Sequence, residues 1–198
     1  MKRAAILLSI ALLSAGCATT REAISLPELD SWETRTAVLG ELREWEFRGR
    51  IAVKAGDEGF NGKIRWIQID ETFNTTVGGP IGIGTVRIEG SGQTVSLTDK
   101  DGVRTELQDA ELELRYRYGW TIPLRSLRYW ALGVPDPALA AETRFGEDGQ
   151  LEYLSQRGWD VAITRYREGG GQSMPNRLSA ENGDTTVRLV IDSWYFFK

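Results

Sequence analysis

The chain of 198 residues contains no histidine and only one cysteine, Cys17. Histidine is the usual general base near neutral pH, cysteine is a common nucleophile, and both are frequent zinc ligands. Their scarcity argues against catalysis, so we expect a protein that is not an enzyme and that uses neither a cofactor nor a metal. A single cysteine also excludes an intramolecular disulfide, which leaves a packed core to supply the stability.

Patterns for other chemistry are weak as well. Acidic side chains cluster at three places, Asp57–Glu58, Glu111/Glu113 and Glu147–Asp148. Most of them flank glycine turns or basic residues, and solvated turn carboxylates explain them better than a glycosidase pair. The glycines near residue 80 lack the G-x-G-x-x-G spacing of a dinucleotide site. A hydrolase would therefore need a nucleophile and a base that the sequence does not offer.

The apolar run near the N-terminus, Ala4–Leu13, is too short to cross a bilayer. It lies between the basic head Met1-Lys2-Arg3 and the small residues Ser14-Ala15-Gly16, which is typical of an export signal. The small residues before Cys17 resemble a bacterial lipobox, whose cysteine is lipidated and becomes the first mature residue. The alternative is an ordinary signal peptide in which the cysteine occurs by chance. Ala18 favours the outer membrane, because lipoproteins of the inner membrane often carry Asp there.

This interpretation divides the chain into a signal peptide, residues 1–16, a lipidated tether, residues 17–29, and one domain, residues 30–198. Removing Lys2 and Arg3 lowers the 24 basic residues to 22 against 28 acidic ones, a formal charge of −6. Nucleic acid is therefore not an expected partner, because binding by counterion release needs a basic surface.

Most of the mature chain alternates between apolar and polar residues with period two. The run from Trp45 to Lys54 shows this most clearly, and similar runs follow one another across short glycine turns up to the hairpin signal Asn182-Gly183. The Gly169-Gly170-Gly171 stretch predicts a mobile loop. The spacing predicts an antiparallel meander of about eleven strands, which must curl into a barrel or split into a sandwich.

Helices are expected at two or three places. Residues 31–44 have apolar side chains at helical spacing, and Asp30 with Glu33 resembles a capping box. Residues 122–133 have a clearer apolar stripe, with Pro123 in the first turn and Gly133 at the end. Residues 109–118 fit either a helix or a strand. The stripe of residues 122–133 must be buried, and a curled sheet is the available partner.

Aromatic residues are abundant, with seven Trp, six Phe and six Tyr. They fill an ordinary core in one interpretation, and in the other they line an apolar cavity for a lipid inside the curled sheet. The alternation predicts the lining of such a cavity as Trp45, Phe47, Ile51, Ile64, Trp66, Leu127, Trp130 and Trp159.

The turn Val77–Thr85 is unusual because it carries apolar residues at its tip. Gly79, Pro80 and Gly82 are typical of a turn, yet Ile81 and Ile83 stand where a solvated turn has Asn, Asp or Ser. The two isoleucines either fold back onto the core or form an apolar projection that touches a membrane or a lipid.

Several short motifs follow one another along the chain: Phe47-Arg48-Gly49-Arg50, Gly79-Pro80-Ile81-Gly82, Ile122-Pro123-Leu124, Trp130 to Pro135, Gly158-Trp159, Met174-Pro175 and Trp194. In these motifs and in their order the chain resembles the LolB family of outer-membrane lipoprotein receptors. The resemblance implies an incomplete antiparallel β-barrel of eleven strands, mainly β with a few helices that cover a hydrophobic cavity for acyl chains.

The resemblance also implies a function. A lipid-anchored protein of the outer membrane, facing the periplasm, would accept acylated lipoproteins from a LolA-like soluble carrier and insert them into outer-membrane lipid. Ile81 occupies the position of an apolar residue, usually Leu, that the family needs for insertion. A basic rim that meets an acidic carrier would come from Arg48, Arg50, Lys54, Lys63 and Arg65. We expect a monomer. The alternative is a lipid-binding or structural envelope lipoprotein without a transfer step.

Overall fold

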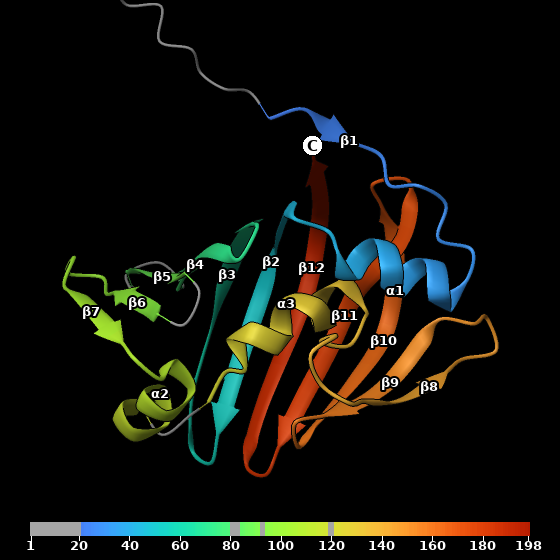
Figure 1. Ribbon diagram of the computed structural model, residues 1–198. Coiled ribbons are helices and arrows are strands. Elements are labelled where there is room, and N and C mark those ends of the chain that lie inside the picture. Colours follow the sequence, from blue (N-terminus) through green and yellow to red (C-terminus); the bar gives the residue numbers. More distant parts are fainter. Residues whose placement is uncertain (1–20, 80–83, 92–93, 119–120) are drawn as a thin grey trace, which may run out of the picture.

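Eleven of the twelve strands form one continuous antiparallel sheet whose two edges do not pair with each other. The computed structural model describes residues 21–79, 84–91, 94–118 and 121–198, and all that follows concerns them. The strand order is β7-β6-β5-β4-β3-β2-β12-β11-β10-β9-β8, and the short β1 pairs with β12 (Figure 1). The strands are β1 (Ala23–Ile24), β2 (Glu44–Ala55), β3 (Glu58–Ile69), β4 (Thr72–Gly78), β5 (Thr85–Ser91), β6 (Thr94–Thr98), β7 (Arg104–Leu107), β8 (Glu142–Phe145), β9 (Leu151–Gln156), β10 (Trp159–Gly169), β11 (Gln172–Asn182) and β12 (Thr185–Phe197).

This architecture confirms the predicted incomplete barrel, with one strand more than expected. The additional strand is β1, which lies within the segment predicted as a tether. Its residues pair with Phe196 and Phe197 of β12. Farther along, Leu26 is 6% exposed and its N–H donates to the carbonyl of Gly170 over 2.8 Å. The chain is therefore attached to the domain from Ala23 onward.

Glycine turns join the strands as the sequence predicts, with one difference. Gly183 has a φ of 58° in the hairpin between β11 and β12, and Arg157 and Gly158 both have positive φ between β9 and β10. The Gly169–Gly171 stretch, expected as a mobile loop, is a tight turn between β10 and β11. A Cβ atom at Gly170 would overlap the ring of Phe196, so the turn is packed against the end of β12.

Three helices accompany the sheet: α1 (Trp32–Gly40), α2 (Ala110–Tyr118) and α3 (Leu124–Leu132). Ser31, rather than the expected Asp30, caps α1 by accepting a hydrogen bond from the Thr34 N–H at 3.1 Å. Residues 109–118 form a helix and not a strand, because the Asp109 carboxylate caps the N–H of Leu112 at 3.0 Å. Helix α3 ends at Gly133, whose φ of 77° suits glycine.

Helices α1 and α3 lie over one face of the sheet, and the core lies between them and the strands (Figure 1). The buried face of α3 consists of Leu124, Ser126, Leu127, Trp130, Ala131 and Leu132. Helix α1 contributes Leu39 and Arg35, whose guanidinium donates to the carbonyl of Ser173 over 2.8 Å. The sheet thus has a covered apolar face and an opposite face that carries most of its charged side chains.

Candidate functional site

The structure brings together all eight side chains that the sequence predicts for an apolar cavity. Each is no more than 4% exposed, and all belong to one hydrophobic core. They come from four elements: Trp45, Phe47 and Ile51 from β2, Ile64 and Trp66 from β3, Leu127 and Trp130 from α3, and Trp159 from β10. The sequence thus identified a coherent group, and its members pack against one another as the interior of the curled sheet.

Stacked aromatic rings run through this interior from strand to strand. The ring of Trp66 stacks on Phe73 with centroids 4.8 Å apart and on Trp45 with centroids 6.2 Å apart. On the other side, Trp45 meets Trp194 at 5.8 Å, and Trp194 stacks on Phe196 at the same distance. Phe73, Trp194 and Phe196 were not among the predicted lining residues, although their period-two positions could have indicated them.

Two buried glutamines hold the indoles in place. Gln68 is 1% exposed, accepts the indole N–H of Trp66 at 3.1 Å and donates to the carbonyl of Asp70 at 2.7 Å. Gln156 is 2% exposed and accepts the indole N–H of Trp130 at 3.0 Å. A buried Trp N–H needs such an acceptor. Sequence analysis did not identify Gln68 or Gln156, because a polar residue at an inward position breaks the alternation of apolar and polar residues that marks a strand.

A pocket of about 520 Å³ lies between α2, α3 and the strands β4 and β6. Phe73, Val95 and Leu124 supply its apolar side, while Arg115 and Arg125 are among the polar residues around it. Because Phe73 stacks on Trp66, the apolar wall of this pocket is continuous with the aromatic stack. The arrangement suits an extended apolar ligand with a polar end outside.

An ion pair across this pocket joins the two ends of the open sheet. Arg157, in the turn between β9 and β10, donates from both terminal nitrogens to the Glu111 carboxylate of α2, at 3.2 and 3.3 Å. Helix α2 follows the edge strand β7, whereas β9 lies next to the other edge, β8. Burial raises the pKa of the Glu111 carboxyl, and the charge of Arg157 opposes that rise. The pair thus links the two ends of the sheet, whose edge strands β7 and β8 do not pair with each other in the described part of the chain.

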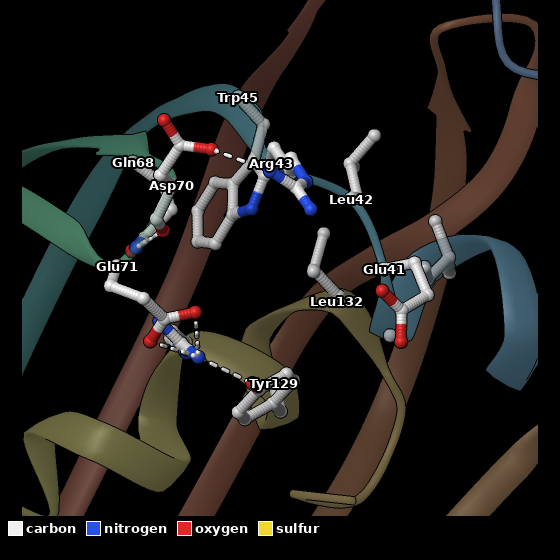
Figure 2. A pocket seen from close by; sticks show the side chains of 12 residues that line it. Glu41, Leu42, Arg43, Trp45, Gln68, Asp70, Glu71, Tyr129 and Leu132 are labelled. Atoms are coloured by element: carbon white, nitrogen blue, oxygen red, sulfur yellow. Dashed lines mark hydrogen bonds and ion pairs between the residues drawn. The ribbon is translucent and has the colours of Figure 1, made fainter.

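A second pocket, of about 200 Å³, lies at the end of the interior beyond α1 (Figure 2). Trp45 and Leu132 reach it from the core, and two ion pairs border it (Figure 2). Arg43 lies 3.4 Å from Asp70, and Arg128 lies 3.1 Å from Glu71. Its lining combines charged side chains with apolar ones, as does the lining of the pocket beside α2.

The predicted membrane-contacting loop falls largely outside the described residues. Of its five predicted members only Gly79 is described, and Pro80, Ile81, Gly82 and Ile83 are not; the predicted lipidation site Cys17 also lies outside. The ends of the loop are well defined, since Gly78 pairs with Thr85 in the ladder between β4 and β5.

The described residues contain neither a metal-binding cluster nor a membrane-spanning helix. Among them, no cluster of three or more His, Cys, Asp or Glu side chains is placed to hold a metal ion. None of the helices within the described ranges has the length and apolar character needed to span a bilayer.

Two solved structures share this fold at low sequence identity. A DUF1329 family protein from Desulfovibrio piger matches with a TM-score of 0.55 and 5% identity, covering 82% of this chain and 89% of its own. A LolA superfamily protein from Nitrosomonas europaea matches with a TM-score of 0.52 and 8% identity, covering 85% of this chain and 94% of its own. At such identities the likeness concerns the fold alone.

Sequence comparison gives a more specific result. The chain is 32% identical over 122 residues to the outer-membrane lipoprotein LolB of Pseudomonas paraeruginosa, and 28% identical over 123 residues to that of Francisella tularensis. Both alignments cover 62% of this chain, and they cover 60% and 59% of the relatives, so the chain spans about 60% of their length. The family model described as outer membrane lipoprotein LolB matches residues 43–194, nearly the whole sheet and both helices that follow β7. The chain therefore belongs to the LolB family.

Proposed function

We propose that this chain is a receptor of the outer membrane that accepts lipoproteins from a LolA-like periplasmic carrier, holds their acyl chains in its apolar interior and inserts them into the outer membrane. The observation that carries the proposal is the pocket beside α2, whose apolar wall leads through Phe73 to the aromatic stack. Membership of the LolB family and the family's printed description support the same role.

In this proposal, an acyl chain enters between α2 and α3 and displaces side chains of the packed interior. Phe73, Val95 and Leu124 would meet it first, and the eight predicted lining residues would surround it farther in. Helix α2 would move to admit the chain, because Leu112 and Tyr116 on it are 63% and 91% exposed and Leu114 is the side chain that anchors it in the core.

The free energy of acyl-chain burial favours a transfer that keeps the chain out of water and needs no external energy source. At ~0.8 kcal/mol per CH₂, an acyl chain of about fifteen methylenes loses on the order of 10 kcal/mol when it is exposed to water. Free passage through water is therefore negligible, and a receptor must take the chain directly from its carrier. Transfer proceeds downhill if this interior binds the chain more tightly than the carrier does and less tightly than the bilayer.

The proposal assigns separate roles to Cys17 and Ile81. The lipid on Cys17 anchors the domain to the outer membrane with its body in the periplasm. Burial of one isoleucine in lipid gains only about 1.5–3 kcal/mol, which is too little to anchor a protein. We therefore assign to Ile81 the release step, in which the loop disturbs the headgroups and opens the exit for the cargo.

A transfer assay tests the proposal. The soluble carrier is loaded with a labelled triacylated lipoprotein and mixed with the unlipidated mature chain carrying Cys17→Ala, and the position of the label is measured before and after liposomes are added. We expect the label to move to this chain and then to the liposomes. Retention of the label by this chain would indicate a lipid-binding envelope protein instead, and failure to leave the carrier would contradict the receptor role.

The role of the loop is tested by Ile81→Glu in the same assay. We expect normal folding and normal acceptance of cargo, with release to liposomes slowed at least about tenfold. Val103→Glu is the matched control, because Val103 is an exposed apolar residue, 59% accessible, in the turn before β7. Equal release by the two variants would contradict a specific role for Ile81.

A further inference from the structure

The face of the sheet opposite the helices carries a shallow groove of about 740 Å³ with basic walls. Successive side chains of a strand point to opposite faces of the sheet. Arg50 and Lys63 are therefore exposed on this face, while their chain neighbours Ile51 and Ile64 are buried in the core on the other. Four of the nine lining residues are cationic and one is acidic: Arg48, Gly49, Arg50, Lys63, Ile64, Arg65, Thr76, Gly78 and Asp192. The groove is therefore basic, although the whole chain has a formal net charge of −4.

The strand register brings these cations to the base of the loop between β4 and β5. Across β2, β3 and β4, one row of paired residues reads Arg50, Lys63 and Gly78. Neighbouring strands lie about 4.8 Å apart, so the backbone of Lys63 is one strand spacing from the start of the loop. The next row reads Arg48, Arg65 and Thr76, and it continues into β5 at Arg87.

Nearby acids neutralise only part of this charge. Glu46 is shared by Arg48 and Arg65, each at 2.7 Å, and Asp192 lies 3.0 Å from Arg50. Within the described part of the chain, Lys63 and Arg87 have no carboxylate within ion-pair distance, and both are exposed. Lys63 and Arg87, near the base of the loop, thus remain available to an external anion.

We infer that this basic face binds the anionic headgroups of phospholipids when the loop between β4 and β5 meets the membrane. The inference rests on the proposed function, to which it adds a lipid class and a binding surface. An apolar loop that enters a bilayer brings the residues at its base to the level of the phosphates, and Lys63 and Arg87 flank that base. A polybasic surface gains free energy at an anionic membrane for each cation held near it.

The position of the groove favours a membrane over an acidic carrier protein as its occupant. The pocket beside α2 is lined by residues of α2 and α3, whereas the groove is lined by residues of the strands β2, β3, β4 and β12, with its cations on the face opposite the core. A carrier that hands over an acyl chain must face the pocket and would leave the groove free. The basic residues expected to form a carrier-docking rim, including Arg48, Arg50, Lys63 and Arg65, lie on this opposite face.

Vesicle binding tests the inference without cargo or carrier. The unlipidated mature chain with Cys17→Ala is sedimented with vesicles of phosphatidylcholine, and with vesicles that also contain phosphatidylglycerol. We expect tighter binding to the anionic vesicles, which weakens as salt is added. Lys63→Glu and Arg87→Glu should each weaken binding to anionic vesicles at least about fivefold and leave binding to neutral vesicles unchanged. Arg144→Glu is the matched control, because it makes the same charge change on β8 at the other edge of the sheet.

The following results would contradict the inference. Equal binding to the two kinds of vesicle, or wild-type binding by Lys63→Glu and Arg87→Glu, would show that this face does not recognise anionic lipid. If these variants instead impaired the uptake of cargo from the carrier and bound vesicles normally, the face would be a protein-docking surface. Transfer of cargo to neutral liposomes measures the proposed function separately, so a failure there and a failure here are distinguishable.

Discussion

Gln156 is a single buried side chain that ties α3 to the loop before β8. Its amide oxygen accepts from the Trp130 indole and from the Asp136 N–H, both at 3.0 Å, and its amide nitrogen donates to the carbonyls of Asp136 and Leu139. Replacing it with leucine leaves these buried groups without partners, and each such group costs about 1–3 kcal/mol. We expect Gln156→Leu to lower the free energy of unfolding by about 3 kcal/mol, measured by urea denaturation. Gln108→Leu, at an exposed position, should change it by less than about 0.5 kcal/mol.

Glu46 makes stability depend on pH at the residue scale. Burial raises its pKa, but hydrogen bonds from Arg65 and Arg48 outweigh this effect and leave the pKa below the ordinary value of 4.5. A carboxyl whose pKa is lowered by folding stabilises the native state above its unfolded pKa, and this contribution is lost as the pH falls through the folded pKa.

Glu46→Gln tests this dependence. We expect the variant to be about 1–2 kcal/mol less stable than the wild type at pH 7, a moderate value because both arginines are about half exposed. The difference should shrink as the pH falls from the ordinary carboxyl pKa of about 4.5 through the lower pKa of the folded Glu46 carboxyl, where the native carboxylate becomes protonated. Urea denaturation at several pH values measures both effects. A difference that stays constant down to acid pH would contradict the role of the charge.

At the scale of an element, the turn between β10 and β11 decides how the N-terminal segment attaches. Gly170 has a φ of 63°, lacks room for a Cβ next to Phe196, and accepts a hydrogen bond from Leu26. Gly183 has a similar φ of 58° in the next hairpin, with no atom within 4 Å of its would-be Cβ.

These two glycines separate backbone strain from packing. Gly183→Ala should cost about 1 kcal/mol through the positive φ alone. Gly170→Ala adds the clash with Phe196, and we expect a total of about 3 kcal/mol together with faster amide exchange in β1. Thermal unfolding and hydrogen exchange measure the two effects. Equal losses in the two variants would mean that the contact with Phe196 is unimportant.

At the scale of the whole molecule, the ion pair of Glu111 and Arg157 connects the two ends of an open sheet. We expect Arg157→Ala to release α2, which increases amide exchange in residues 110–118 and speeds the uptake of a fluorescent fatty acid severalfold. Global stability should fall by no more than about 1 kcal/mol, because both side chains are partly exposed. Arg115→Ala removes a cation from the same pocket without breaking the pair and is the control. Unchanged uptake in both variants would exclude α2 as the gate.

Much of the fold could be predicted, because its main signals are local. The alternation from Trp45 to Lys54 determined which side chains of β2 face inward. Gly158 and Gly183 determined the positions of two hairpin turns. The stripe on residues 122–133 likewise predicted a buried helix, which the structure has at Leu124–Leu132. Residues 109–118 remained ambiguous in sequence, because their apolar positions fit both periods and only the cap by Asp109 favours the helix.

The sequence by itself determined the succession of strands along the chain, the inward set of residues and the apolar character of the interior, since each depends on neighbours a few positions apart. Only the tertiary structure decided which of those residues meet. Gln156 reaches Trp130, and Arg157 reaches Glu111, across 26 and 46 positions. The row from Arg50 through Lys63 to Gly78 exists only because three strands pair in one register. Such contacts depend on long-range chain closure and pairing register, which local periodicity does not specify.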